Sequence, residues 1–365
     1  MSWQFGTDGA ASAAPSPPPG RTECLLIGAA EEPDMGGLGV DATLKRLRDS
    51  VKNDLGKMIE FCAKWAKDEP PTKMAKTSSR TPSLPVHSKA QASLKCPVVI
   101  TTIIVSNNTL VPGSDDTGIP LSAKAKTFMQ SCRPKLLVYQ NKEQVRDAVR
   151  NFTKRSSCDN LIIFYAGHGV QQEIKAGKVV EEDNDKPCKK GSQESAASKL
   201  MEVREKVVKE IQHSLYLPCP RFPHQDLLIE YYDLYPDHEF TSDVTVHLEP
   251  SQNMYLVLHA CNSGGMFHGW QLRADQRLRG PETSLSVAVF ASSEAENVSD
   301  WTSLGGDADF VSIFTEFAKP GKKLIEIQSD IFKASVQRNR DRKPGVSPAL
   351  IVLRPDQRDE LFLPK

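Results

Sequence analysis

A cysteine and a histidine, each at the end of a short apolar run, are the residues of this sequence best suited to do chemistry. The first run, residues 255–260, leads to Cys261 and then to a pair of glycines at 264 and 265. The second run, residues 160–166, leads to His168, which lies between two glycines. A free thiol has a pKa of about 8.5, so a catalytic cysteine needs a neighbouring imidazole or a positive local field. Cys261 as nucleophile and His168 as its base therefore form a candidate dyad for cysteine-dependent acyl transfer.

Acyl transfer also requires hydrogen-bond donors for the oxyanion that develops on the attacked carbonyl. Backbone N–H groups in a glycine-rich turn can supply them, and the amides of Gly169 and Cys261 are the predicted donors. Glycine at 169 would allow the backbone to come close to the substrate carbonyl, and the glycines after Cys261 would allow a sharp turn.

Both apolar runs have the length and composition of buried strands in a parallel sheet. Open α/β sheets bind ligands outside the carboxyl ends of such strands, so strands ending on Cys261 and His168 would bring thiol and imidazole to one edge. Strands alternating with helices predict an α/β fold, with a mostly parallel sheet and helices on both faces. The other predicted strands are residues 24–28, 98–105, 136–139, 227–234, 285–291 and 349–353, and the predicted helices are residues 42–65, 142–155, 200–211, 309–317 and 324–338.

Length and composition bound the possible partners. The 365 residues, with an apolar content of 39%, can bury a substantial core. Lys plus Arg equals Asp plus Glu at 46 each, which gives no argument for a nucleic-acid partner or an anionic membrane. No apolar run approaches the roughly 20 residues that span a bilayer, and no secretory signal is apparent, so we expect a cytoplasmic or nuclear protein. The eight cysteines include no C-x-x-C pair, and no metal site is predicted.

Two kinds of segment are predicted to lie outside the packed core. Residues 1–21 are rich in Ala, Ser, Pro and Gly and are expected to form a disordered tail. Residues 22–365 are expected to form one domain with polar insertions at about 68–95 and 171–225. The second insertion contains an acidic cluster at 181–185 followed by lysines at 186–190, which are either a flexible segment or a processing site.

The two strand ends, YAGHG at 165–169 and ACNSG at 260–264, together resemble the paired motif of the caspase, metacaspase and paracaspase superfamily of cysteine peptidases. Metacaspase-like proteins are the most similar group. The strand and helix from residue 25, and VFASS at 289–293, resemble the first strand and the substrate loop of that superfamily, so the likeness frames most of residues 22–355.

The resemblance implies a caspase-like three-layer sandwich and a cysteine-type endopeptidase that acts on polypeptides. Cys261 would attack the peptide carbonyl, His168 would shuttle the proton, and an acyl-enzyme would then be hydrolysed. By analogy alone, the resemblance also implies a role in regulated cell death or in stress handling. No cofactor is expected, although metacaspases leave calcium activation open; the acidic cluster at 181–185 lacks EF-hand spacing.

The position two residues before the nucleophile departs from the family pattern. Metacaspases and paracaspases carry an Asp there, which helps to hold a basic P1 side chain, and caspases carry a Gln, whereas this sequence has His259. His259 either lines the substrate pocket or fills space in the interior. A weaker preference for Arg or Lys than in metacaspases follows from this change. The predicted pocket residues are His259, Ala291, Ser292, Ser293 and Asp34, and the acids Glu31 and Glu32 beside Asp34 offer further negative charge.

Three functions are compatible with these residues. The leading hypothesis is an endopeptidase. A catalytically silent caspase-like scaffold or interaction protein is the alternative, favoured by the missing Asp but opposed by the presence of both Cys261 and His168. The third is cysteine-dependent acyl transfer on a small amide, which would require a deep, closed pocket. Monomer and dimer are equally compatible with the sequence.

Overall fold

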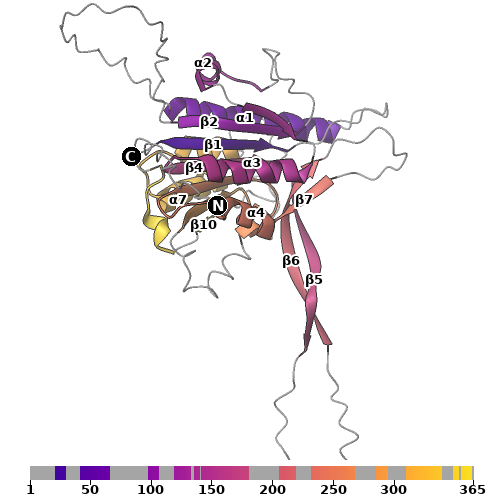
Figure 1. Ribbon diagram of the computed structural model, residues 1–365. Helices are drawn as coiled ribbons and strands as arrows, with labels where there is room; N and C mark the ends of the chain where they lie inside the picture. The colour runs from indigo at the N-terminus through magenta and orange to yellow at the C-terminus, as the bar shows by residue number, and fades with distance from the viewer. Residues whose placement is uncertain are drawn as a thin grey trace, which may run out of the picture.

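The computed structural model describes residues 21–29, 42–65, 98–106, 119–132, 135–139, 141–180, 205–218, 232–267, 285–294, 310–338, 348–352 and 355–363. In this part of the chain a seven-stranded sheet lies at the centre, in the strand order β10-β9-β8-β4-β1-β2-β3 (Figure 1). Neighbouring strands are parallel except for β10, which is antiparallel to β9. The protein therefore has a mixed α/β fold with a mostly parallel sheet.

The strands of this sheet are short apolar runs. Every residue of β4 is buried, as expected for a parallel strand covered on both faces. The sequence predictions for these strands are confirmed to within two residues at each end. Their bounds are β1 Thr22–Gly28, β2 Val98–Ser106, β3 Lys135–Tyr139, β4 Asn160–Ala166, β8 Asn253–His259, β9 Ser286–Ala291 and β10 Ala349–Val352.

Helices cover both faces of the sheet and define two apolar cores. Alternate residues of β4 belong to different cores: Phe164 packs with α1, α2, α6 and α7, whereas Tyr165 packs with α3 and α4. The helices are α1 Ala42–Trp65, α2 Ala123–Cys132, α3 Lys142–Arg155, α4 Asp237–Thr245, α6 Phe310–Phe317 and α7 Leu324–Arg338, with 3₁₀ turns η1 Ser263–Phe267 and η3 Pro355–Asp359. The predicted helices at 142–155 and 324–338 are confirmed at both ends, whereas α2 and α4 were not predicted.

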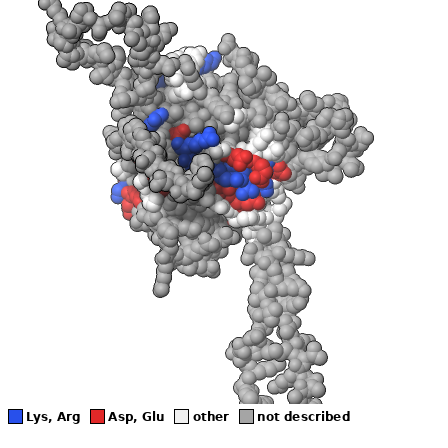
Figure 2. All heavy atoms as spheres, viewed as in Figure 1, with Lys and Arg blue, Asp and Glu red and all other residues white. Residues whose placement is uncertain are grey.

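A network of ion pairs joins α3 to α4, where Figure 2 shows acidic and basic side chains close together. Arg146 lies 2.7 Å from the carboxylate of Asp243 and 3.2 Å from that of Glu239, and Arg150 lies 3.1 Å from Asp243. The Tyr235 hydroxyl also donates to Asp243, at 2.9 Å. The hydrogen bond to Asp243 raises the pKa of Arg146 above its usual range. Through these contacts the buried Asp243 links α4, on which it lies, to α3 and β7.

A second, three-stranded antiparallel sheet has the order β5-β6-β7. Its strands are β5 Gly169–Val180, β6 Glu205–Pro218 and β7 Tyr232–Pro236. The β5–β6 hairpin begins directly after His168 and extends away from the central sheet (Figure 1). The predicted insertion at 171–225 thus contains most of a hairpin whose base lies beside the candidate dyad.

The helix predicted at 200–211 is wrong for residues 205–211, which are part of β6. The charged residues of this segment suit a surface helix locally, but pairing with β5 makes it a strand. The strand predicted at 227–234 corresponds in part to β7, which ends two residues later.

Several predictions fall on residues outside the described ranges. These are the disordered tail at 1–20, the insertion at 68–95, the acids Glu31, Glu32 and Asp34, and the charged residues at 181–190. In the ranges given above, no helix is long and apolar enough to cross a membrane.

Candidate active site

Strands β4 and β8 are parallel neighbours, and their register places the predicted dyad at one edge of the sheet. Ala166 is paired with His259 at the ends of the two strands. His168 and Cys261 each follow two residues later. The N–H of Gly167 donates to the carbonyl oxygen of His259 at 3.1 Å, so the two segments are still hydrogen-bonded to each other where the strands end. The structure thus brings together the two motifs that are 93 residues apart in the sequence.

The backbone at Gly169 lies against the backbone of Cys261. A Cβ at position 169 would overlap the carbonyl oxygen of Cys261 and would lie 3.2 Å from the Cβ of Ala260. This position therefore requires glycine because of the close approach of two chain segments. The contact also places the predicted histidine and cysteine segments in direct van der Waals contact.

The pairing pattern of β5 with β6 indicates that the N–H of Gly169 points away from the hairpin. Tyr216 donates its N–H to the carbonyl oxygen of His168 at 3.0 Å, and Gly169 is the next residue, opposite Leu215. Hydrogen-bonded and non-hydrogen-bonded pairs alternate along an antiparallel ladder, so the N–H of Gly169 is not used by β6. This orientation is required for a backbone donor to an oxyanion, the role predicted for Gly169 and Cys261.

His168 is held by two tyrosines. The hydroxyl of Tyr165 lies 2.9 Å from the carbonyl oxygen of His168 and 2.8 Å from that of Tyr216. Burial raises the pKa of Tyr165 well above its usual value, so the hydroxyl keeps its proton and acts as a donor. The ring of Tyr216 contacts the His168 imidazole edge to face, with centroids 5.7 Å apart. These contacts fix the backbone of His168 and restrict its ring, which is partly exposed.

Cys261 is a partly exposed, reduced cysteine at the start of a tight turn. The next residue, Asn262, has a φ of 54°, a left-handed conformation in which Asn is enriched among residues other than glycine. The N–H of Gly265 donates to the carbonyl oxygen of Asn262 at 2.9 Å, and η1 follows. This turn follows closely on the end of β8 at His259.

Ser292 and Ser293, predicted to line the substrate pocket, support this turn. Both are fully buried, and their hydroxyls lie 3.2 and 3.1 Å from the carbonyl oxygen of Ala260. Ser293 Oγ also accepts the N–H of Ser263 at 3.3 Å. Ala291, the last residue of β9, is fully buried as well. The structure shows a supporting role for the two serines, and contact with a substrate stays a prediction.

His259 is buried with a polar partner rather than exposed beside the dyad. Its Nδ1 lies 2.7 Å from Oδ2 of Asp54 in α1, and both side chains are only 2% exposed. Its ring also lies against Phe310 of α6, with centroids 5.8 Å apart. Of the two alternatives that the sequence left open, the structure shows the interior one. Asp34, the acid predicted to line the pocket, lies outside the described residues.

Asp54 and His213 are two site residues that the sequence analysis missed. Asp54 lies between Val51 and Leu55 on the apolar face of α1, and a charge on that face was a signal for a buried partner. His213 of β6 is buried, and a Cβ at Gly265 would overlap its imidazole. No sequence pattern indicated that contact, because it depends on the hairpin folding back onto the turn.

The hairpin contacts both halves of the dyad. Besides the bonds of Tyr216 to the His168 segment, His213 packs on the turn after Cys261. The Asn262 amide donates to Oε1 of Gln171 in β5 at 3.3 Å. The base of the hairpin is therefore part of the candidate site.

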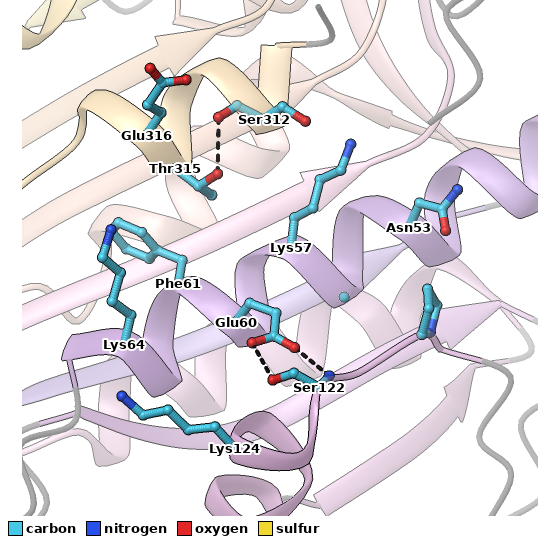
Figure 3. Close-up of a pocket in the computed structure, with 12 residues that line it drawn as sticks. Asn53, Lys57, Glu60, Phe61, Lys64, Ser122, Lys124, Ser312, Thr315 and Glu316 are labelled. Atoms are coloured by element: carbon cyan, nitrogen blue, oxygen red, sulfur yellow. Dashed lines mark hydrogen bonds between the residues drawn. The ribbon is translucent and has the colours of Figure 1, made fainter. Parts of the chain in front are cut away.

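A separate groove of about 610 Å³ lies between α1, the start of α2 and α6 (Figure 3). Glu60 in this groove accepts hydrogen bonds from the N–H and the hydroxyl of Ser122, at 2.5 and 2.8 Å. Neither Cys261 nor His168 lines it. The lining residues are Asn53, Gly56, Lys57, Glu60, Phe61, Lys64, Pro120, Ser122, Lys124, Ser312, Thr315 and Glu316.

The sequence matches no model of a known protein family, and it has no significant match among curated proteins. Within the described part of the chain, no group of three or more His, Cys, Asp or Glu side chains is arranged to hold a metal ion.

Proposed function

We propose that this protein is a cysteine-type endopeptidase of the caspase-like superfamily, with Cys261 and His168 as its catalytic dyad. The observation that carries the proposal is the register of β4 and β8, which brings both residues to one edge of the sheet. The contact between Gly169 and the Cys261 backbone supports it. The seven-stranded sheet, covered by helices on both faces, supports the caspase-like sandwich as part of the same proposal.

In the proposed reaction, His168 accepts the proton of the Cys261 thiol as Sγ attacks the carbonyl carbon of a peptide bond. The N–H groups of Gly169 and Cys261 stabilise the oxyanion that forms. The C–N bond breaks, His168 returns the proton to the leaving amine, and a thioester remains on Cys261. Water, deprotonated by His168, attacks the thioester and releases the carboxylic acid and the free thiol.

The proposal is tested by covalent labelling with peptide acyloxymethyl ketones, read by intact mass. Wild-type protein should gain one label, and Cys261→Ala should gain none. Cys132→Ala is the matched control, because Cys132 is another partly exposed, reduced cysteine, in α2, and its removal should leave labelling unchanged. Equal labelling of wild type and Cys261→Ala, or no labelling of either, would reject the peptidase in favour of a silent scaffold.

Calcium activation is tested in the same assay. Labelling rates would be compared in a calcium buffer and in a chelator. A rate that rises with calcium would place a cation site in the protein, whereas equal rates would support the proposed cofactor-free dyad.

A further inference from the structure

We propose that Asp54 is a positioning residue that acts through His259 to fix the end of β8, and with it the position of Cys261 relative to His168. This inference rests on the proposed function only in taking Cys261 and His168 as the reacting pair. Asp54 itself lies in α1 and does not reach a substrate.

The bond between Asp54 and His259 joins two elements that are distant in sequence. The two residues are 205 positions apart, and their side chains meet at 2.7 Å in a nearly dry environment. The surrounding side chains of α1, including Val51, Leu55 and Met58, are apolar and buried. Burying polar or charged groups costs free energy, and a hydrogen bond between them recovers part of it only in a defined geometry. The pair therefore specifies one position of β8 against α1, which apolar contacts alone specify less well.

His259 is held from three directions at once. Asp54 binds one ring nitrogen, and Phe310 of α6 packs against the ring. The carbonyl oxygen of His259 accepts the N–H of Gly167, the residue directly before His168. A shift of His259 would therefore move the histidine segment as well as the cysteine turn. Small displacements between reacting groups are costly, since about 1 Å can reduce a rate by roughly a hundredfold.

Lys57 is a further charged neighbour of this carboxylate. Lys57 Nζ lies 3.9 Å from the other oxygen of Asp54, at the long end of the range for an ion pair. Lys57 also lines the groove of Figure 3. The shorter bond to His259 is the one that reaches the candidate site.

The test compares the alkylation rate of Cys261 with that of Cys132, using iodoacetamide on the native full-length protein and peptide mapping. Cys132 is an internal reference because it lies in α2, away from the dyad. Asp54→Asn should lower the Cys261 to Cys132 rate ratio by roughly tenfold to a hundredfold. Asp54→Glu, which keeps the carboxylate, should recover part of the loss. The readout reports the reactivity of the thiol and does not depend on peptide hydrolysis.

The matched control is Val257→Ala, on the same strand and in the same core as His259, without a polar partner. It should lower the melting temperature and leave the Cys261 to Cys132 rate ratio within about twofold of the wild-type value. If Asp54→Asn does not fold, the double variant Asp54→Val/His259→Leu replaces both partners by apolar groups, which is often tolerated. This double variant should fold with a lowered ratio.

An unchanged ratio in a folded Asp54→Asn or double variant would overturn the inference, even if wild type is labelled by peptide ketones. A lowered ratio together with an unlabelled wild type would uphold the positioning role and reject the peptidase. The two proposals therefore fail separately.

Discussion

At the scale of single residues, the candidate site depends on close approach as much as on reactive side chains. The types and spacing of Cys261 and His168 predicted the dyad, and the strand register places them as expected. Glycine at 169 was predicted to let the backbone approach a substrate. In the structure it is required for a nearer reason, because a Cβ there would overlap the carbonyl oxygen of Cys261. Asp54 was not predicted as a partner of His259, because a contact between α1 and β8 is not visible in local periodicity.

Substituting Gly169 by alanine tests that close approach. Gly169→Ala should abolish labelling of Cys261, because the added Cβ would push the turn away from the histidine segment. Overpacking of this kind typically costs about 1 to 3 kcal/mol of stability. The measurements are labelling by intact mass and urea unfolding.

Gly321→Ala is the matched control for loss of stability alone. Gly321 has a φ of 81° and open space around its Cβ position, so alanine is strained there but touches nothing. It should cost about 1 to 2 kcal/mol and leave labelling intact. Normal labelling of Gly169→Ala would contradict the packing of the two segments.

At the scale of elements, apolar strands and amphipathic helices were predictable, and the hairpin was not. Helix α3 matched its prediction at both ends, with an Asn141 side chain that accepts the N–H of Gln144 as an N-cap. Strand β6 was mistaken for a helix over 205–211, because the strand that pairs with these residues, β5, lies well before them in the sequence. Helix α2 was missed because only Ala125 and Phe128 of its ten residues are buried, which leaves little periodic signal.

The connection between α3 and α4 should depend on Asp243. Asp243→Ala would leave two arginines and the Tyr235 hydroxyl without their shared acceptor, and we expect a loss of about 3 kcal/mol in the free energy of unfolding. Asp147→Ala is the control, because Asp147 is exposed and lies 3.6 Å from Arg150. It should change stability by less than about 1 kcal/mol. Equal losses in the two variants, measured in urea, would show that the network contributes little.

Strand β1 carries a carboxyl group whose titration should be visible in stability. Burial raises the pKa of Glu23 above its ordinary value, despite a hydrogen bond from Ser156. A carboxyl group with a raised pKa in the folded state favours folding below its unfolded pKa of about 4.3 and loses that contribution as the pH rises through the folded value. Glu23→Gln should therefore be more stable than wild type at neutral pH. The difference in melting temperature between Glu23→Gln and wild type should shrink or reverse as the pH is lowered. A difference that stays constant with pH would contradict the raised pKa of Glu23.

At the scale of the whole molecule, the α/β class and the mostly parallel sheet followed from alternating strands and helices, and the structure confirms them. The sequence could not show how the segments after His168 return to the site, because that return is made by long-range pairing of β6. The substrate preference of the proposed peptidase would also depend on the whole molecule, since loops that follow several different strands would form its pocket. His259 is withdrawn into the interior, so it offers no charge to a substrate.

The predicted substrate preference follows from that arrangement. A peptide-library cleavage profile should show a weaker preference for Arg or Lys at P1 than metacaspases show, because no carboxylate stands two residues before Cys261. A strict basic profile in wild type would show that other acids, such as Asp34, supply the charge.

The length of the hairpin strands sets the far end of β5 well away from the candidate dyad. With 12 residues in β5, its far end lies roughly 35 to 40 Å from His168. A peptide bond cut between residues 181 and 204 would divide the chain into one piece bearing the imidazole and one bearing the thiol. Those pieces would still be interleaved through neighbouring strands β4 and β8 and through the ladder of β5 with β6. Such a nicked protein should remain a single particle in which Cys261 and His168 keep their positions, so nicking there would break the chain without dismantling the candidate site.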